Sequence, residues 1–205
     1  GLTDTYTEWG IEATDLGLMW DNGDENNPEI LFVLGDTFGQ WRGSGGGGDD
    51  WRSNALLRSS NSDWRERGME FSSAALDDSG RAKEIIPSKK INHDEMTAIP
   101  TGGIAVDGRQ YVAYMSVNHW GDPGRWFTNY SRIAYSDDNG GTWNTTSGPT
   151  WENNEEWSNK FQMVAFTRGD GDGYVYMFGT ENGRFGPIHL GRVPERALLD
   201  KDAHT

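Results

Sequence analysis

The sequence predicts an all-β fold of the β-propeller type, of which these 205 residues supply about three blades. Helical periodicity is scarce, and short apolar runs bounded by Gly, Asn and Asp recur along the chain. The composition agrees with this pattern. The 28 glycines favour tight turns, and 10 Trp, 7 Tyr and 8 Phe residues can bury enough surface for a folded core.

The positions of the apolar runs give the order of the elements. Each run contains β-branched or aromatic residues and ends at a turn-forming residue. Clear strands are predicted over residues 30–35, 111–117, 131–136, 161–167, 174–179 and 188–193, and weaker ones over 14–20, 53–59, 97–99 and 103–106. The single expected helix covers residues 194–200, where Pro194 precedes good helix formers.

Three pairs of these strands repeat as hairpins with Gly- and Asp-containing turns, which tolerate positive φ. The pairs are 14–20 with 30–35, 103–106 with 111–117, and 161–167 with 174–179. Their spacing of roughly 60–80 residues fits a four-stranded propeller blade, and a closed ring needs at least four blades. We therefore expect residues 1–205 to be one propeller domain that is incomplete and N-terminal, completed by a C-terminal remainder or a second copy.

Two loops stand out between the strands. Residues 43–50 are rich in Gly and Asp and predict a flexible surface loop. Residues 136–143 read S-D-D-N-G-G-T-W, which resembles the Asp box of β-propeller glycosidases and lectins. In such a turn Asp138 accepts backbone N–H bonds, the glycines adopt positive φ and Trp143 packs back onto the blade. This motif predicts a structural role.

Charge and composition exclude several classes of partner. With 18 Lys and Arg against 32 Asp and Glu, the net charge of −14 argues against nucleic acid. The absence of cysteine excludes disulfides and thiolate zinc sites. The sequence contains no run of 18 apolar residues, so it predicts no membrane-spanning segment. The four histidines, at 93, 119, 189 and 204, are scattered, so we expect no metal and no cofactor.

An acidic, Trp-rich β protein favours carbohydrate as its ligand. Sugar rings pack their C–H faces on indole, and their hydroxyls bind carboxylates and amides. Five tryptophans lie in loops beside Gly, Asp, Asn or Arg: Trp41, Trp51, Trp64, Trp120 and Trp126. Packing within a blade is the alternative for each one alone.

Two aspartates are the candidate catalytic pair. Asp15 interrupts an apolar strand, and Asp36 ends the run Ile30 to Gly35, so the first hairpin carries one carboxyl on each arm. Aspartate is costly to bury unpaired, and like-charge proximity would separate the two pKa values. Glycoside hydrolysis needs such a pair. The sequence assigns neither the acid nor the stereochemical outcome.

Five segments then resemble the bacterial domain-of-unknown-function family 4185: TDLGLMWDNG (14–23), FVLGDTF (32–38), IPTGGIAV (99–106), GDPGRW (121–126) and YMFGTENGRFG (176–186). The resemblance implies an endo-D-arabinanase of glycoside hydrolase family 183 with a five-bladed propeller. It implies that Asp15 and Asp36 are the catalytic aspartates and that the substrate is actinobacterial arabinan, in arabinogalactan and lipoarabinomannan. We accordingly expect a secreted or cell-surface protein. The family's domain is longer than this chain.

Polar residues at corresponding ends of successive hairpins are the candidate substrate contacts, because such ends converge at a propeller's central funnel. They are His93, Asp94, Glu95, Asn118, Trp120, Gln162, Glu181, Asn182 and Arg184. A non-catalytic propeller lectin is the alternative, although a lectin would not need two opposed aspartates. A sialidase is disfavoured, since its three-arginine cluster and Phe-Arg-Ile-Pro-like start are not evident and the chain is acidic.

Overall fold

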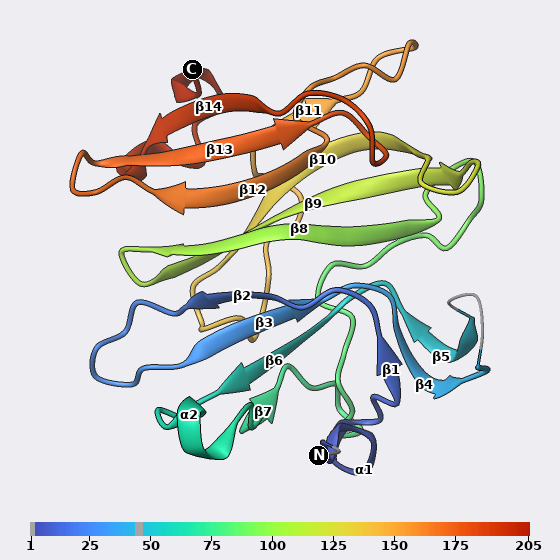
Figure 1. The fold of residues 1–205 in the computed structure, drawn as a ribbon, viewed down its shortest axis with the longest axis vertical. Helices are drawn as coiled ribbons and strands as arrows, with labels where there is room; N and C mark the ends of the chain where they lie inside the picture. The colour runs from blue at the N-terminus through green and yellow to red at the C-terminus, as the bar shows by residue number, and fades with distance from the viewer. Residues whose placement is uncertain (1–2, 44–46) are drawn as a thin grey trace.

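The computed structural model describes residues 3–43 and 47–205 and confirms an all-β protein, built from four antiparallel sheets (Figure 1). The first sheet has the order β2 (Leu18–Asp21), β3 (Ile30–Leu34), β6 (Ala55–Ser59), β7 (Ser73–Ala74). The second is β8 (Thr97–Val106), β9 (Arg109–Trp120), β10 (Trp126–Ser136), β11 (Thr150–Glu152). The third is β12 (Met163–Arg168), β13 (Tyr174–Thr180), β14 (His189–Pro194). A side sheet joins β1 (Ala13–Thr14), β4 (Thr37–Trp41) and β5 (Gly48–Arg52).

The three main sheets meet through their first strands. β2 contacts β8, β8 contacts β12, and all three run from right to left in Figure 1. Their starts therefore lie at one end of the molecule, which we call the strand-start end. Within the described residues, 3–43 and 47–205, no backbone hydrogen bond joins the first sheet to the third.

The core lies between neighbouring sheets. Trp20 of the first sheet packs against apolar side chains of the second and donates its indole N–H to Gln110 at 2.8 Å. Gly103 allows this packing, because a Cβ there would lie 2.2 Å from the Trp20 ring. Ile104 and Ile133 of the second sheet pack against Val175 of the third. Alternating apolar residues on each strand supply these faces.

Several predicted elements have different bounds in the structure. The predicted strand 14–20 divides into β1 and β2, and the two predicted strands 97–99 and 103–106 are one strand, β8, with a register shift between Pro100 and Gly102. The helix expected over 194–200 was wrong. β14 continues to Pro194, and only the 3-10 turns Glu195–Ala197 and Lys201–Ala203 follow.

The chain also has elements that the sequence did not predict. Two short helices, α1 (Thr5–Trp9) and α2 (Trp64–Arg67), lack a long periodic pattern. In the loop expected over 43–50, residues 44–46 lie outside the described residues. Gly48 to Asp50 belong to β5, which was therefore missed.

The Asp box forms the predicted turn after β10. One oxygen of Asp138 accepts the Thr142 N–H at 2.7 Å, and the other accepts the Thr142 hydroxyl at 2.7 Å. Gly140 has φ 81°, and its carbonyl accepts the Trp143 indole N–H at 3.1 Å. Trp143 packs against the core between the first two sheets. The turn is thus held together by its own hydrogen bonds, as expected for a structural unit.

We expect Asp138→Ala to lower the free energy of unfolding by about 1–3 kcal/mol, the usual range for hydrogen-bond partners left unsatisfied. Denaturant unfolding measures this change. Asp137→Ala is the matched control, because its exposed ion pair with Arg109 at 2.6 Å contributes only about 0–1 kcal/mol. Equal stability of the two variants, or a selective loss of ligand binding in Asp138→Ala, would contradict the structural role.

Candidate active site

Asp15 and Asp36 face each other at the strand-start end. Asp15 was predicted inside a strand but lies outside one, and Asp36 follows the end of β3, close to the predicted end of that strand. Asp15 lies between β1 and β2, where the chain passes from the side sheet to the first sheet. Asp36 lies between β3 and β4, where the chain returns to the side sheet. The Asp15 N–H donates to the Asp36 carbonyl at 3.1 Å, and the Gly35 N–H donates to the Asp15 carbonyl at 3.0 Å. This backbone pairing fixes the two residues opposite one another.

The backbone next to Asp15 is strained. Leu16 has φ 59°, a left-handed conformation that is costly for a residue with a Cβ, and Gly17 has φ 155°. These two residues redirect the chain between β1 and β2, so that Asp15 leaves the strand geometry. Such strain persists where the surrounding structure imposes it, and it is common at functional sites.

The carboxyl of Asp36 is held by two donors from distant parts of the chain. Its Oδ1 atom accepts the Trp51 indole N–H at 2.8 Å and the Thr97 hydroxyl at 2.8 Å. Burial raises the pKa of Asp36, while the hydrogen bonds from Thr97 and Trp51 oppose this shift. Both donors engage the same oxygen, Oδ1.

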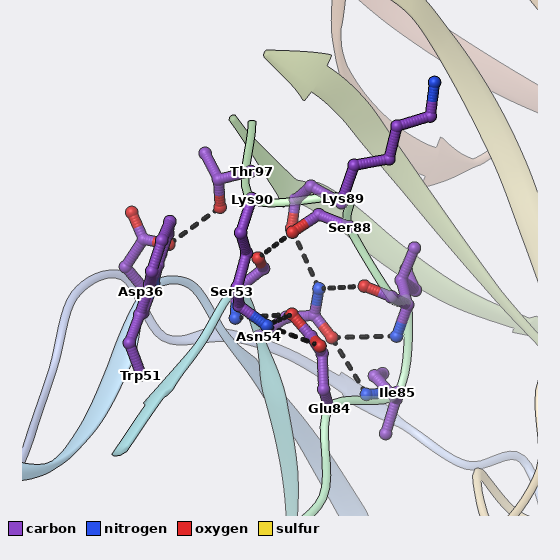
Figure 2. A network of polar contacts seen from close by, with 12 residues as sticks. Asp36, Trp51, Ser53, Asn54, Glu84, Ile85, Ser88, Lys89, Lys90 and Thr97 are labelled. Carbon is purple, nitrogen blue, oxygen red and sulfur yellow. Dashed lines mark hydrogen bonds and ion pairs between the residues drawn. The ribbon is translucent and has the colours of Figure 1, made fainter. Parts of the chain in front are cut away.

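A second layer of contacts positions Trp51 (Figure 2). Lys90 lies over the Trp51 ring, with its Nζ atom 5.5 Å from the ring centroid, and pairs with Glu84 at 2.9 Å. Glu84 in turn accepts the Ser53 N–H at 2.8 Å. Lys90 has φ 58°, a further strained position in the loop beside the pair.

Buried Asn54 anchors that loop to the second sheet. It accepts the N–H groups of Ile85 and Ile86 at 3.0 and 2.9 Å, and it donates to the Ala98 carbonyl at 2.8 Å (Figure 2). Since Ala98 follows Thr97, this contact also fixes the position from which Thr97 reaches Asp36.

The carboxyl of Asp15 lies against backbone. A Cβ built on Gly35 would lie 2.0 Å from the Asp15 Oδ1 atom, so only glycine leaves room for it. Desolvation by this packing, together with the negative charge of Asp36, raises the pKa of Asp15 to about 6. Asp15 nevertheless remains solvent-exposed as a residue, which allows a substrate to reach it.

Asp15 lines one wall of a cleft of about 530 Å³ at the strand-start end. The cleft is bounded by residues of all three main sheets, among them Leu18, Ile99, Met115, Trp120, Trp126, Met163 and Phe178. This volume is in the ordinary range for small-molecule sites. A larger hollow of about 800 Å³ lies near α1 and α2, but neither aspartate lines it. The cleft next to the carboxyl pair is the better candidate site.

Two of the predicted substrate contacts, Trp120 and Arg184, line this cleft. Gln162 and Asn182 instead point into the protein. Gln162 is buried and bonds to Thr128 at 2.7 Å, and Asn182 donates to the Trp126 carbonyl at 2.8 Å. Glu181 is half-buried beside Asn182.

The remaining predicted contacts are His93, Asp94, Glu95 and Asn118, and they form a separate group beside β9 and β10. The His93 and His119 rings contact each other at an interplanar angle of 33° with centroids 4.5 Å apart, and Asn118 donates to the Asp94 carbonyl at 3.2 Å. Glu95 accepts the Ser116 hydroxyl at 2.6 Å. These contacts tie the 88–95 loop to the second sheet.

The five tryptophans predicted in loops have different roles, and the predicted location was wrong for all of them. Four lie in the strands β4, β5, β9 and β10, and Trp64 is the first residue of α2. Trp120 and Trp126 meet edge to face in the cleft, and Trp51 holds Asp36. Trp41 is exposed on β4, and Trp64, in α2, stacks on Phe32 of β3. Sequence reasoning missed Thr97, Lys90 and the supporting role of Trp51. A threonine at the first position of an apolar strand was the only local signal for Thr97.

No group of three His, Asp or Glu side chains that could hold a metal ion occurs in residues 3–43 and 47–205. Over the same residues, no helix is long and apolar enough to cross a membrane.

Fold and site define an all-β protein with two aspartates held opposite one another, one of them on the wall of an apolar cleft. The chain belongs to the family described as a domain of unknown function (DUF4185), whose model matches residues 1–205. This confirms the family resemblance seen in the sequence.

Two curated relatives are similar along most of the chain. Notoamide biosynthesis cluster protein J from Aspergillus sp. (strain MF297-2) is 35% identical over 94% of this chain, and protein J' from Aspergillus versicolor is 33% identical over 94%. These matches cover 52% and 53% of the relatives, so the chain spans about half their length. A Bacteroides ovatus crystal structure, provisionally described as a hydrolase, superposes with a TM-score of 0.52 at 14% identity, covering 95% of this chain and 52% of that one. This last likeness concerns the fold alone.

Proposed function

We propose that this protein is a glycoside hydrolase that cleaves internal D-arabinofuranosyl linkages of actinobacterial cell-wall arabinan. The observation that carries the proposal is the pair Asp15 and Asp36, which the backbone holds opposite one another, with Asp15 on the wall of a cleft. The family membership supports the D-arabinan substrate through the resemblance, and a secreted or cell-surface location follows from such a substrate.

The two carboxyls have environments that suit different roles. Asp15, with its pKa raised to about 6, would protonate the oxygen of the leaving group. Asp36 would act as the ionised partner, because Trp51 and Thr97 stabilise negative charge on its Oδ1 atom and leave Oδ2 to attack the anomeric carbon or to activate water. The anomeric form of the first product distinguishes these two routes.

We further propose that the three main sheets are blades of a β-propeller, five-bladed as the resemblance implies. Supporting this, each sheet is an antiparallel meander or a close variant of one, and β2, β8 and β12 lie side by side. The relatives are about twice as long as this chain, which leaves room for further blades in proteins of this family.

The test is incubation with mycobacterial-type arabinogalactan, followed by sizing of the soluble products. Internal cleavage should first release oligosaccharides of mixed length, whereas the Asp15→Asn variant should release almost none. A plant L-arabinan serves as the substrate control. A chain that binds D-arabinan without releasing products would instead be a lectin, the alternative function.

A further inference from the structure

The cleft beside Asp15 is unusually apolar for a surface that would bind a sugar. Its walls carry Met115 and Met163 in addition to aromatic side chains. Four large apolar residues there remain exposed: Leu16 by 54%, Trp120 by 46%, Phe178 by 43% and Ile188 by 71%. Large exposed apolar side chains gathered in one concave site mark a ligand surface.

Few polar side chains line this cleft. The indole Nε1 atom of Trp126 is buried there and has no hydrogen-bond partner within the described residues, whereas other polar groups beside the cleft are bonded within the protein. The Thr101 hydroxyl donates to the Val164 carbonyl at 2.9 Å and accepts the Val164 N–H at 3.2 Å. Gln162 donates to the Trp151 carbonyl at 2.8 Å and accepts from Thr128. A ligand hydroxyl buried against these walls would lose water and gain little in return.

We infer that this cleft is the subsite for the leaving group and that it binds a ring through an apolar face. The inference rests on the proposed function. A general acid gives its proton to the bridging oxygen, so the group attached to that oxygen lies on the side of Asp15, and Asp15 is on the cleft wall. Asp36, which does not line the cleft, lies toward the other half of the substrate.

Trp120 and Phe178 supply the ring surfaces that such a group would contact. Two ring types offer the same chemistry: the C–H face of an arabinofuranose, or an aromatic aglycone. Both would keep their hydroxyls, or their polar edge, toward solvent.

Binding of non-hydrolysable thioglycosides tests the subsite independently of turnover. The ligands are phenyl 1-thio-α-D-arabinofuranoside, an S-linked arabinofuranosyl disaccharide, and the methyl 1-thio analogue, which has no second ring. Calorimetric dissociation constants should be lower for at least one ringed ligand than for the methyl analogue. Trp120→Ala should raise the dissociation constant of that ligand by about 3- to 10-fold, the range for aromatic stacking, and Phe178→Ala should also raise it.

Two variants serve as controls. Trp120→Phe should retain most of the affinity, and Tyr6→Ala, which removes an aromatic side chain 52% exposed in α1, should leave it unchanged. A Trp120 effect on the phenyl ligand alone identifies an aromatic aglycone, and an effect on the disaccharide alone identifies a sugar. Unchanged affinity of both ringed ligands in Trp120→Ala, or equal binding of the methyl analogue, overturns the inference. If only the proposed function fails, the ringed thioglycosides will still bind more tightly than the methyl analogue, but the corresponding O-linked glycosides will not be cleaved.

Discussion

Replacement of either aspartate of the pair, by Asp15→Asn or Asp36→Asn, is expected to lower kcat on D-arabinan by at least ~10²-fold, the scale of positioned acid–base catalysis. Both substitutions preserve shape and allow the fold to persist. Asp36→Asn still presents an oxygen to Trp51 and Thr97. Asp170→Asn, in the turn between β12 and β13, is the matched control and should keep full activity.

Substrates with different leaving groups distinguish the proposed roles of Asp15 as the acid and Asp36 as the ionised partner. With 4-nitrophenyl α-D-arabinofuranoside, departure needs little protonation, so Asp15→Asn should lose much less activity than it loses on arabinan. Asp36→Asn should be impaired on both substrates. An equal loss in the two variants on both substrates would contradict the assignment of Asp15 as the acid, and wild-type turnover in either variant would remove that residue from the mechanism.

The pH dependence has a definite sign. Asp15 donates only when protonated, so wild-type kcat/KM should fall as pH rises through about 6, the raised pKa of this carboxyl. Because this folded-state pKa lies above the ordinary value of 3.8, the native state binds the proton more tightly than the unfolded state does. Stability from Asp15 is therefore present at low pH and is lost as pH rises toward 6. Asp15→Asn should consequently match or exceed wild-type Tm at pH 7 while losing activity.

Most strands of the main sheets could be predicted from local pattern, whereas the short edge strands β7 and β11 were missed. β3, β9 and β13 are rich in β-branched and aromatic residues, and a glycine lies at or next to the end of each. Short helices such as α1 carry no periodic stripe, so nothing in the sequence announced them. The run after Pro194 has good helix propensity, but it is too short to outweigh tertiary contacts.

Of the candidate site, the sequence could predict the two aspartates but not the residues that hold them. Asp15 and Asp36 stand out because aspartate next to buried apolar runs needs compensation. Trp51 and Thr97 reach Asp36 from 15 and 61 residues away along the chain, and such contacts depend on the register of the side sheet and of β8. The cleft itself combines residues from all three main sheets, so no single segment could reveal its apolar character.

A substitution outside the pair should show how closely the site depends on local packing. Gly35→Ala is expected to reduce kcat by about 10²-fold, the cost of a displacement of about 1 Å in a catalytic group. The added Cβ would lie 2.0 Å from the Asp15 Oδ1 atom and 3.0 Å from the Leu16 side chain. The φ of Gly35 is outside the left-handed region, so alanine fits the backbone.

The structure relieves this clash most easily by moving the Asp15 carboxyl, which is the end of a side chain, toward solvent. The moved carboxyl would be better hydrated, and its pKa would return toward 3.8, so the fall in kcat/KM should shift to lower pH. Gly47→Ala is the control, because no atom lies within 4 Å of its added Cβ. Thermal unfolding of both variants close to wild type, with activity lost only in Gly35→Ala, would show that glycine is required here for the position of the acid. Full activity in Gly35→Ala would mean that the Asp15 carboxyl works from another position.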